Sequence, residues 1–424
     1  MDVYRTLGVS PIVNASGSLT TLGGSRTHDA VMEAMKEANK RYVFMSELQA
    51  AASNVISEAT GAESGIVTAG CFSAMVAASA ASMMRDTGLL KIVEAHGLAN
   101  LPQESFEWID TIQLLPRFEE NKPDAEFYSQ RAPMLQNRIK DEFIIQRTHR
   151  NHYDNAFTVA GGRLVWVGAL TDWIDEDEYW HSRQPVSIRD LGTKITDKTA
   201  AIVFVQYHAE RGGIQLEDTI QIAHKHSVPV IVDACNMLPP RRNLRTAIDA
   251  GADLVCFSGG KAIRGPNDTG ILAGRSELVR LAHAFGPPYH GLCRGYKVGK
   301  EQIVGLIKAL QIYVKQDDKT ELDAWNRKVK YVADALKANP NVIEAKQITS
   351  QHPLIPMAQI VIDENRLGMT TRDVWTKLRK GDPPVVLRIQ SDFAKPGSLI
   401  FNPFCLENGE EELVVSAIKR VLRK

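Results

Sequence analysis

A lysine surrounded by glycines follows one of the most apolar segments of this sequence. In "FSGGKAIRGPNDTG", residues 257–270, Lys261 comes shortly after the apolar run "ADLVCF". Such a run is typical of a buried strand, and glycines at this density indicate a sharp turn or a close approach of the backbone to another group. The end of this strand is therefore a candidate position for a reactive amine.

A carboxylate occupies the same kind of place earlier in the chain. Asp233 ends the apolar run "VPVIVD", and parallel α/β sheets form their ligand crevice outside the carboxyl ends of such strands. A lysine amine in an apolar pocket can form a Schiff base with an aldehyde, and a carboxylate can keep a pyridine nitrogen protonated so that the ring accepts electrons. These are the two requirements of pyridoxal 5'-phosphate, which we expect as the cofactor.

The phosphate of that cofactor needs a group of hydrogen-bond donors. The turn "TAGCFS", residues 68–73, lies between the expected strand "GIV" and a helix rich in small residues, and its Gly70 lets the backbone approach an anion. Ser258 can add a hydroxyl. Taken singly, each residue has a structural alternative: Lys261 as a charge at a strand end, Asp233 as a helix cap, Ser258 as a turn residue. Their shared position at strand ends favours the cofactor site.

The elements that must position these residues follow from hydrophobic periodicity. Between about residues 50 and 275, apolar runs such as "AAIVFVQ" alternate with helix-length segments, which predicts a mainly parallel sheet covered on both faces. From about residue 280, "EQIVGLIKALQIYVKQ" and "ELDAWNRKVKYVADALKA" carry apolar residues at helical spacing. We expect an N-terminal segment over 1–45, a large cofactor-binding α/β domain over 46–280 and a small α+β domain over 281–424.

Charge and composition exclude several classes of partner. The 424 residues include 50 Lys plus Arg and 50 Asp plus Glu, so that no bulk attraction to nucleic acid or to an anionic membrane is expected. The five cysteines form no CxxC pair, which favours a reducing compartment. No apolar stretch is long enough to cross a membrane. These features predict a cytoplasmic protein without a membrane or nucleic-acid partner.

Several longer segments resemble a known family. They are "VNASGSLTTLGGS", "TGAESGIVTAG", "RTHRNHYDNAF", "PVIVDA", "SGGKAIRGPNDTGILAGR" and "YKVGKEQIVGL", with a weaker similarity in "FNPFCLENGEEE". Together they resemble the fold type I pyridoxal-phosphate enzymes related to selenocysteine synthase and to D-glucosaminate-6-phosphate ammonia-lyase. The resemblance implies the fold of that class, with a seven-stranded sheet flanked by helices and a smaller C-terminal α+β domain, and at least a homodimer.

The resemblance also implies roles for individual residues. Lys261 would carry the cofactor and Asp233 would face its ring nitrogen, while Ser258, Gly70 and Cys71 would hold the phosphate. An imidazole would lie against the ring, from either His149 or His152, and His208 could touch the phenolate oxygen or the substrate. Cys71, Phe72 and Asn267 differ from the residues common in the family, which leaves the substrate open.

The substrate side follows from the chemistry of an amino acid. Arginine matches a carboxylate with a two-pronged fork, and the candidates for this role are Arg264, Arg294 and Arg388. Lys261 would take the α-proton. The resemblance favours a lyase that acts on a β-hydroxy or otherwise β-substituted amino acid by α,β-elimination; a racemase, or a transferase acting by β-replacement, remains an alternative.

Three other classes of protein share single features with this sequence. A P-loop would need glycine at position 255 and Ser or Thr at position 262, where the chain has Val255 and Ala262. The histidine pairs at positions 149 and 152 and at 224 and 226 lack an accompanying HExxH motif, so we expect no metal. A non-enzymatic binding protein is the third class, and only the binding of the cofactor separates it from an enzyme.

Overall fold

The structure is a computed structural model that describes residues 2–96, 139–168, 186–209, 213–289, 291–350, 353–389 and 397–423. The chain divides into two compact units. The smaller unit comprises Met1–Arg26, Leu238–Arg241 and Lys315–Lys424, and the larger unit comprises Thr27–Met237 and Arg242–Val314. The expected domain boundaries near residues 45 and 280 stay predictions, because close packing alone does not define a folding domain.

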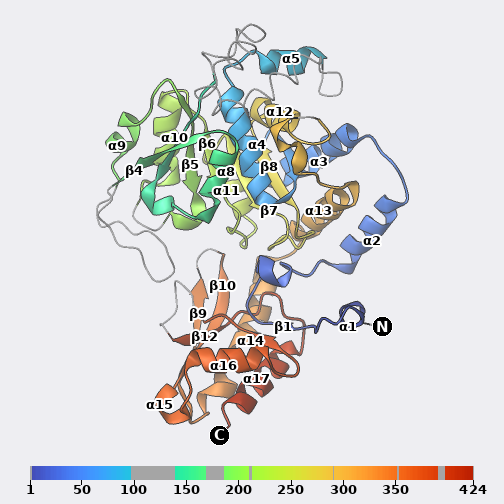
Figure 1. Cartoon of the computed structure of the whole chain (residues 1–424), viewed down its shortest axis with the longest axis vertical. Helices are drawn as coiled ribbons and strands as arrows, with labels where there is room; N and C mark the ends of the chain where they lie inside the picture. Colours follow the sequence, from blue (N-terminus) through green and yellow to red (C-terminus); the bar gives the residue numbers. More distant parts are fainter. Residues whose placement is uncertain are drawn as a thin grey trace. The chain divides into compact units, whose positions relative to one another are not determined.

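The larger unit is built on one sheet (Figure 1). Within the described residues this sheet has seven strands in the order β2-β8-β7-β6-β5-β3-β4. All neighbouring strands run parallel except β8, which runs antiparallel to both β2 and β7. The predicted mainly parallel sheet is confirmed. The strands are β2 Ser64–Thr68, β3 Glu142–Gln146, β4 Arg163–Val167, β5 Thr199–Val205, β6 Val230–Asp233, β7 Leu254–Ser258 and β8 Gly270–Gly274.

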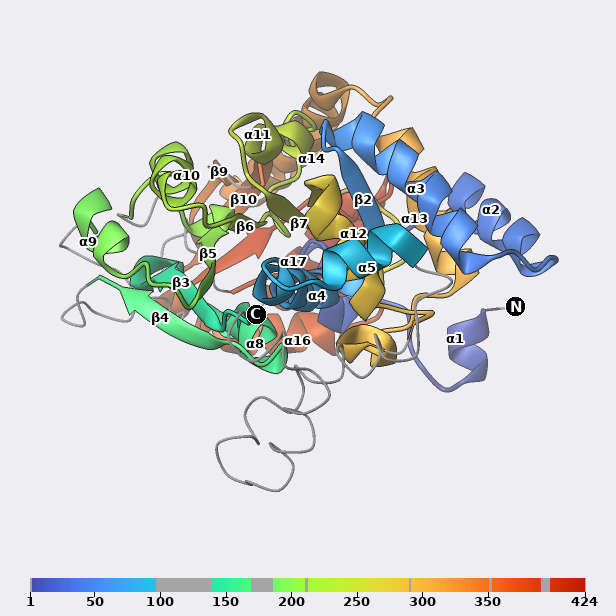
Figure 2. The same cartoon turned by 90° about the horizontal axis from the view of Figure 1, so that it is seen from above.

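Helices cover both faces of this sheet (Figure 2). Helices α10 and α11 lie on one side, and α4 and α8 lie on the other. Helix α4 is buried along most of its length and packs against α12, β7 and β8, because its many alanines and serines allow close approach. The helices are α2 Asp29–Asn39, α3 Met45–Thr60, α4 Gly70–Met84, α5 Leu89–His96, α8 Asn155–Val159, α9 Ile188–Thr193, α10 Leu216–Lys225, α11 Asn243–Asp249, α12 Ser276–Phe285 and α13 Lys300–Tyr313.

The strand register brings the carboxyl ends of several strands to one edge. Gly270 of β8 pairs with Thr68 of β2 on one side and with Ser258 of β7 on the other. Cys256 of β7 pairs with Asp233, which in turn pairs with Val205 of β5. The last residues of β2, β7, β6 and β5 therefore lie along a single edge of the sheet, as expected for a site at strand ends.

The smaller unit has an α+β arrangement, as predicted for the C-terminal part. Its antiparallel sheet has the order β12-β10-β9, and a short strand β1 pairs with β11 in parallel. Helix α14 packs on β9 and β10 around Val329, Ile360 and Phe401. The elements are α1 Val3–Thr6, β1 Val13–Asn14, α14 Asp318–Lys337, β9 Val342–Ser350, β10 Ile355–Ile362, α15 Glu364–Leu367, α16 Thr371–Arg379, β11 Val385–Val386, β12 Ser398–Phe401 and α17 Glu410–Val421.

Across the part of the chain that the structure describes, no helix combines the length and the apolar character needed to cross a lipid bilayer.

Candidate active site

The two residues expected to bind the cofactor meet at one cysteine. The backbone N–H of Cys235 donates to Oδ1 of Asp233 over 3.0 Å, because the chain turns immediately after β6. Nζ of Lys261 approaches Sγ of the same cysteine at 3.7 Å. Cys235 therefore links the carboxylate and the amine, which the sequence had placed on separate strand ends.

The environment changes the ionisation of both groups. Burial raises the pKa of Asp233, opposed by its hydrogen bonds from Cys235 and by the charge of Lys261. Burial by itself would lower the pKa of Lys261, but the charges that Cys235, Cys71 and Asp233 can carry outweigh it and raise that pKa. The amine is therefore an ammonium at neutral pH until an aldehyde reacts with it.

Two further thiols surround the same carboxylate. Sγ of Cys71 lies 4.0 Å from Oδ1 of Asp233, and Cys256 pairs with Asp233 in the neighbouring strand. A hydrogen bond with Cys235 and burial hold the pKa of Cys71 well above its usual value, and burial does the same for Cys256. These two thiols are therefore protonated at neutral pH and ionise only at higher pH, where the Lys261 amine also titrates. Sequence reasoning named Cys71 alone, although "VDAC" already placed Cys235 two residues after Asp233.

The turn between β2 and α4 has the geometry of an anion site. Gly70 adopts a φ of 81°, which glycine tolerates and other residues rarely adopt. The hydroxyl of Thr68 donates to the Gly70 carbonyl over 3.0 Å, and that of Ser73 donates to the Ala69 carbonyl over 2.8 Å. These bonds fix the turn, while the first N–H groups of α4 and the helix dipole favour a bound anion.

Strand β8 supports this turn by direct backbone contact. A Cβ atom added to Gly270 would lie 2.4 Å from the carbonyl carbon of Gly70. Ser258 pairs with the same Gly270, so its position is beside the turn. The amine, the carboxylate and this turn fit pyridoxal 5'-phosphate, which needs a partner for its aldehyde, its ring nitrogen and its phosphate.

His149 and His152, which sequence spacing could not distinguish, differ in burial. His149 is buried at the end of a short helix, Arg147–His149; its Nδ1 accepts the Val205 N–H over 3.2 Å and its ring meets Phe204 edge-on with centroids 4.6 Å apart. His152 is exposed in the following turn. His208 is buried in the turn after β5, with its ring 5.3 Å from that of Tyr207.

An acidic residue missed by sequence reasoning lies in the same loop. Asp154 is buried; its Oδ2 accepts the Asn151 N–H over 3.1 Å, and its Oδ1 makes no hydrogen bond. Burial raises the pKa of Asp154 to about 7, against the opposing effects of that bond and of Arg150 and with a contribution from the charge of Asp233. Asp154 is therefore a second carboxyl group in the electrostatic range of the site, within the segment "RTHRNHYD".

The three arginines lie in different surroundings. Arg264 follows Lys261 in the same turn, where its N–H donates to the Lys261 carbonyl over 2.9 Å, and it has a φ of 57°. Arg294 is half-buried in the short helix Leu292–Gly295 of the larger unit. Arg388 belongs to the smaller unit, where its Nε donates to the Ser16 carbonyl over 2.8 Å. Their substrate roles stay predictions.

Known proteins are similar in sequence to this chain, two of them over nearly its whole length. The aminotransferase class-V family model matches residues 167–289. A 5'-C-glycyluridine monooxygenase-decarboxylase from a Streptomyces species is 28% identical over 99% of this chain and 92% of its own length. A D-glucosaminate-6-phosphate ammonia lyase from Salmonella typhimurium is 25% identical over 99% of this chain and 98% of its own.

A solved structure of D-glucosaminate-6-phosphate ammonia-lyase has the same fold. It superposes with a TM-score of 0.74 at 24% identity, covering 100% of this chain and 98% of its own. The predicted resemblance, the fold, the assignment as an enzyme and the cofactor are confirmed. The chain is therefore an enzyme that has the fold type I architecture and uses pyridoxal 5'-phosphate, and it is similar to D-glucosaminate-6-phosphate ammonia-lyase.

Proposed function

We propose that the protein is a lyase that removes a β-substituent, preferentially a hydroxyl, from an amino acid. The observation that carries this proposal is the convergence of Lys261 and Asp233 on Cys235. When bound, the cofactor supplies an electron-accepting ring that stabilises a carbanion at the substrate Cα. The relationship to an ammonia lyase over nearly the whole chain supports elimination as the outcome.

Residues of the larger unit would bind the cofactor and transfer the substrate proton. Lys261 would hold the cofactor, and its Nζ would accept the α-proton of the substrate. Asp233 keeps the ring nitrogen protonated. The hydroxyl of Ser258 and the backbone N–H groups at Gly70 and Cys71 bind the phosphate.

The remaining polar residues orient the ring and the substrate. His149 or His152 lies against the ring, and His208 reaches the phenolate oxygen or the substrate. One arginine of Arg264, Arg294 and Arg388 binds the substrate carboxylate in a two-pronged arrangement, which fixes the Cα–H bond for removal by Lys261.

The reaction balances without an oxidant. The α-proton passes to Lys261, and the β-substituent leaves with the electron pair of its bond; a β-hydroxyl leaves as water after it gains a proton. The resulting enamine takes up water and releases ammonia, so that the net products of a β-hydroxy amino acid are a 2-oxo acid and ammonia.

A chemical test of the cofactor linkage comes first. Reduction with borohydride should join a pyridoxyl group to the peptide that contains Lys261, as read by mass spectrometry, and Lys261→Ala should abolish both the label and the near-visible absorption. Lys308→Ala, a second lysine in the larger unit, is the matched control. A label on another lysine would overturn the assignment.

The reaction is tested with purified holoenzyme and a panel of β-substituted amino acids. Release of 2-oxo acid together with ammonia supports the lyase. A change of optical rotation without either product would indicate a racemase, and incorporation of an added nucleophile at the β-carbon would indicate a transferase.

A second candidate is an oxygen-dependent decarboxylation. It is favoured by the monooxygenase-decarboxylase that matches 99% of this chain. Release of CO2 that requires air and stops under nitrogen, with no 2-oxo acid formed by elimination, would replace the lyase by this activity.

The proposal includes a homodimer. The segment "SGSLTTLGGS" and Arg264 are the candidates for a wall shared between two subunits. Sedimentation of an active monomer would contradict this part of the proposal and leave the rest intact.

A further inference from the structure

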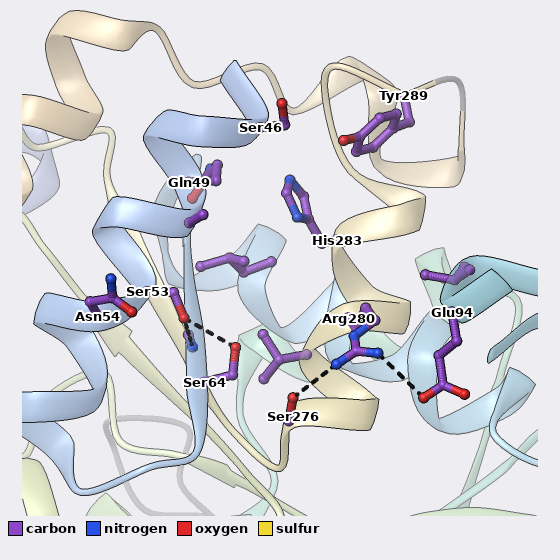
Figure 3. Close-up of a pocket in the computed structure, with 15 residues that line it drawn as sticks. Ser46, Gln49, Ser53, Asn54, Ser64, Glu94, Ser276, Arg280, His283 and Tyr289 are labelled. Atoms are coloured by element: carbon purple, nitrogen blue, oxygen red, sulfur yellow. Dashed lines mark hydrogen bonds and ion pairs between the residues drawn. The ribbon is translucent and has the colours of Figure 1, made fainter. Parts of the chain in front are cut away.

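A second pocket lies away from the cofactor site, at the outer edge of the central sheet (Figure 3). It has a volume of about 590 Å³ and lies between α3 and α12, over the amino-terminal half of the edge strand β2. The turn at Thr68 is at the opposite end of that strand. The volume is in the range of pockets that hold small molecules.

The pocket is closed to an added peptide strand. The amide of Gln49 spans Val67: Nε2 donates to the Val67 carbonyl over 2.8 Å and Oε1 accepts the Val67 N–H over 3.0 Å. Oγ of Ser53 accepts the Gly65 N–H over 3.0 Å. Side chains of α3 therefore occupy backbone groups that an additional strand would need, so this edge of the sheet is not a peptide-docking site.

Two buried polar atoms face this pocket without a hydrogen bond. They are Nε2 of His283 and the hydroxyl of Tyr289, in side chains of residues only 9% and 7% exposed. The two rings meet at a steep angle with centroids 5.4 Å apart, and Figure 3 shows the Tyr289 hydroxyl pointing toward His283. Buried polar atoms are normally paired, so these two are the natural hydrogen-bonding positions for a ligand.

The charge of the pocket selects the chemical class of that ligand. Burial lowers the pKa of His283 to about 4, so that its ring is uncharged at neutral pH. Arg280 is paired with Glu94 over 3.3 Å, and these opposite charges compensate each other. The other polar lining groups are uncharged hydroxyls and amides, from Ser46, Asn54, Ser64 and Ser276 among others.

Part of the pocket lining is apolar. Ile66 and Val279 present C–H surface beside the hydroxyls. Groups that both donate and accept hydrogen bonds, next to a small apolar surface and without net charge, complement a ring that carries several hydroxyls. We propose that this pocket binds an uncharged sugar, either free or as part of a nucleoside, with one hydroxyl between His283 and Tyr289.

The test uses the purified holoenzyme and calorimetric titration at millimolar concentrations. One arm contains D-glucose and D-ribose, and the other contains uridine and adenosine. We expect saturable binding of at least one compound, and the arm in which it occurs identifies the source of the sugar. Tyr289→Phe and His283→Phe should each weaken that binding by about tenfold, the effect of losing one hydrogen bond to a buried partner.

Two controls keep the test decisive. Tyr331→Phe, an exposed tyrosine of the smaller unit, should leave binding unchanged. Ser46→Leu at the pocket should block binding by bulk if the phenylalanine variants fold poorly. All variants should keep the cofactor absorption. Absence of saturable binding by every compound, or binding that survives both Tyr289→Phe and Ser46→Leu, would overturn the proposal.

Discussion

The two ends of strand β2 serve regions of opposite electrostatic character. At the carboxyl end, Thr68 leads into the turn proposed to bind the phosphate, which lies near the half-buried Lys261, two acidic residues with raised pKa values and several thiols. At the amino end, Ser64 lies in a pocket whose charges are compensated and whose buried histidine is neutral. One strand can therefore support, at its two ends, a site that depends on ionised groups and a pocket suited to an uncharged ligand. Their responses to mutation and pH should therefore separate.

The largest separation is expected from removal of the carboxylate at Asp233. Asp233→Ala removes the proposed partner of the ring nitrogen, and we expect kcat/KM to fall by about 10²–10³-fold, the typical loss for one preorganised electrostatic group. Sugar binding at the outer pocket should not change. Steady-state kinetics and calorimetry on the same preparation measure both quantities. An equal loss at both positions would mean that the two regions are not independent.

The next effect concerns Asp154 and the pH dependence of stability. Its folded-state pKa is raised from 3.8 to about 7, so the folded protein binds an extra proton between these values. Its contribution is present below pH 4 and is lost as the pH rises toward 7, by about 1.4 kcal/mol for each pH unit at most. Asp154→Asn should remove this loss in urea unfolding of the cofactor-free protein. An unchanged pH profile would show that the carboxyl is solvated.

His283 should give the opposite sign over a narrower range. Its folded-state pKa is lowered from 6.5 to about 4, so the unfolded chain binds the extra proton in this window. Stability should therefore fall as the pH drops from 6.5 to 4. His283→Phe should remove that slope in the same unfolding experiment. Coincident slopes for the wild type and the variant would contradict a buried neutral imidazole.

The smallest effect is expected at the edge of the sheet. Gln49→Ala leaves the N–H and the carbonyl of Val67 without their side-chain partners. We expect a loss of about 1–2 kcal/mol in the free energy of unfolding. Gln347→Ala, which removes an exposed side-chain hydrogen bond to Asn326, is the matched control and should change the free energy of unfolding little. A loss as small as that of the control would show that water replaces the Gln49 amide.

Strand periodicity and strand ends were enough to predict the sheet and the approach of Lys261 to Asp233. Apolar runs report burial on both faces, and parallel strands place their carboxyl ends together. Which of His149 and His152 is buried could not be predicted, because the spacing does not show the packing of the His149 ring against Phe204. Asp154 gives no local signal, since its raised pKa comes from burial. The outer pocket joins segments far apart in sequence, so no single stretch predicts it.

The glycine at the start of β8 has a consequence for how firmly the cofactor is anchored. Because the backbone of Gly270 lies directly against the main chain of Gly70 with no side chain between them, the turn proposed to bind the phosphate packs directly on the sheet. Rocking of α4 would have to displace a hydrogen-bonded strand. The turn is therefore as rigid as the sheet beneath it. Any larger residue at position 270 would push the turn away from the sheet.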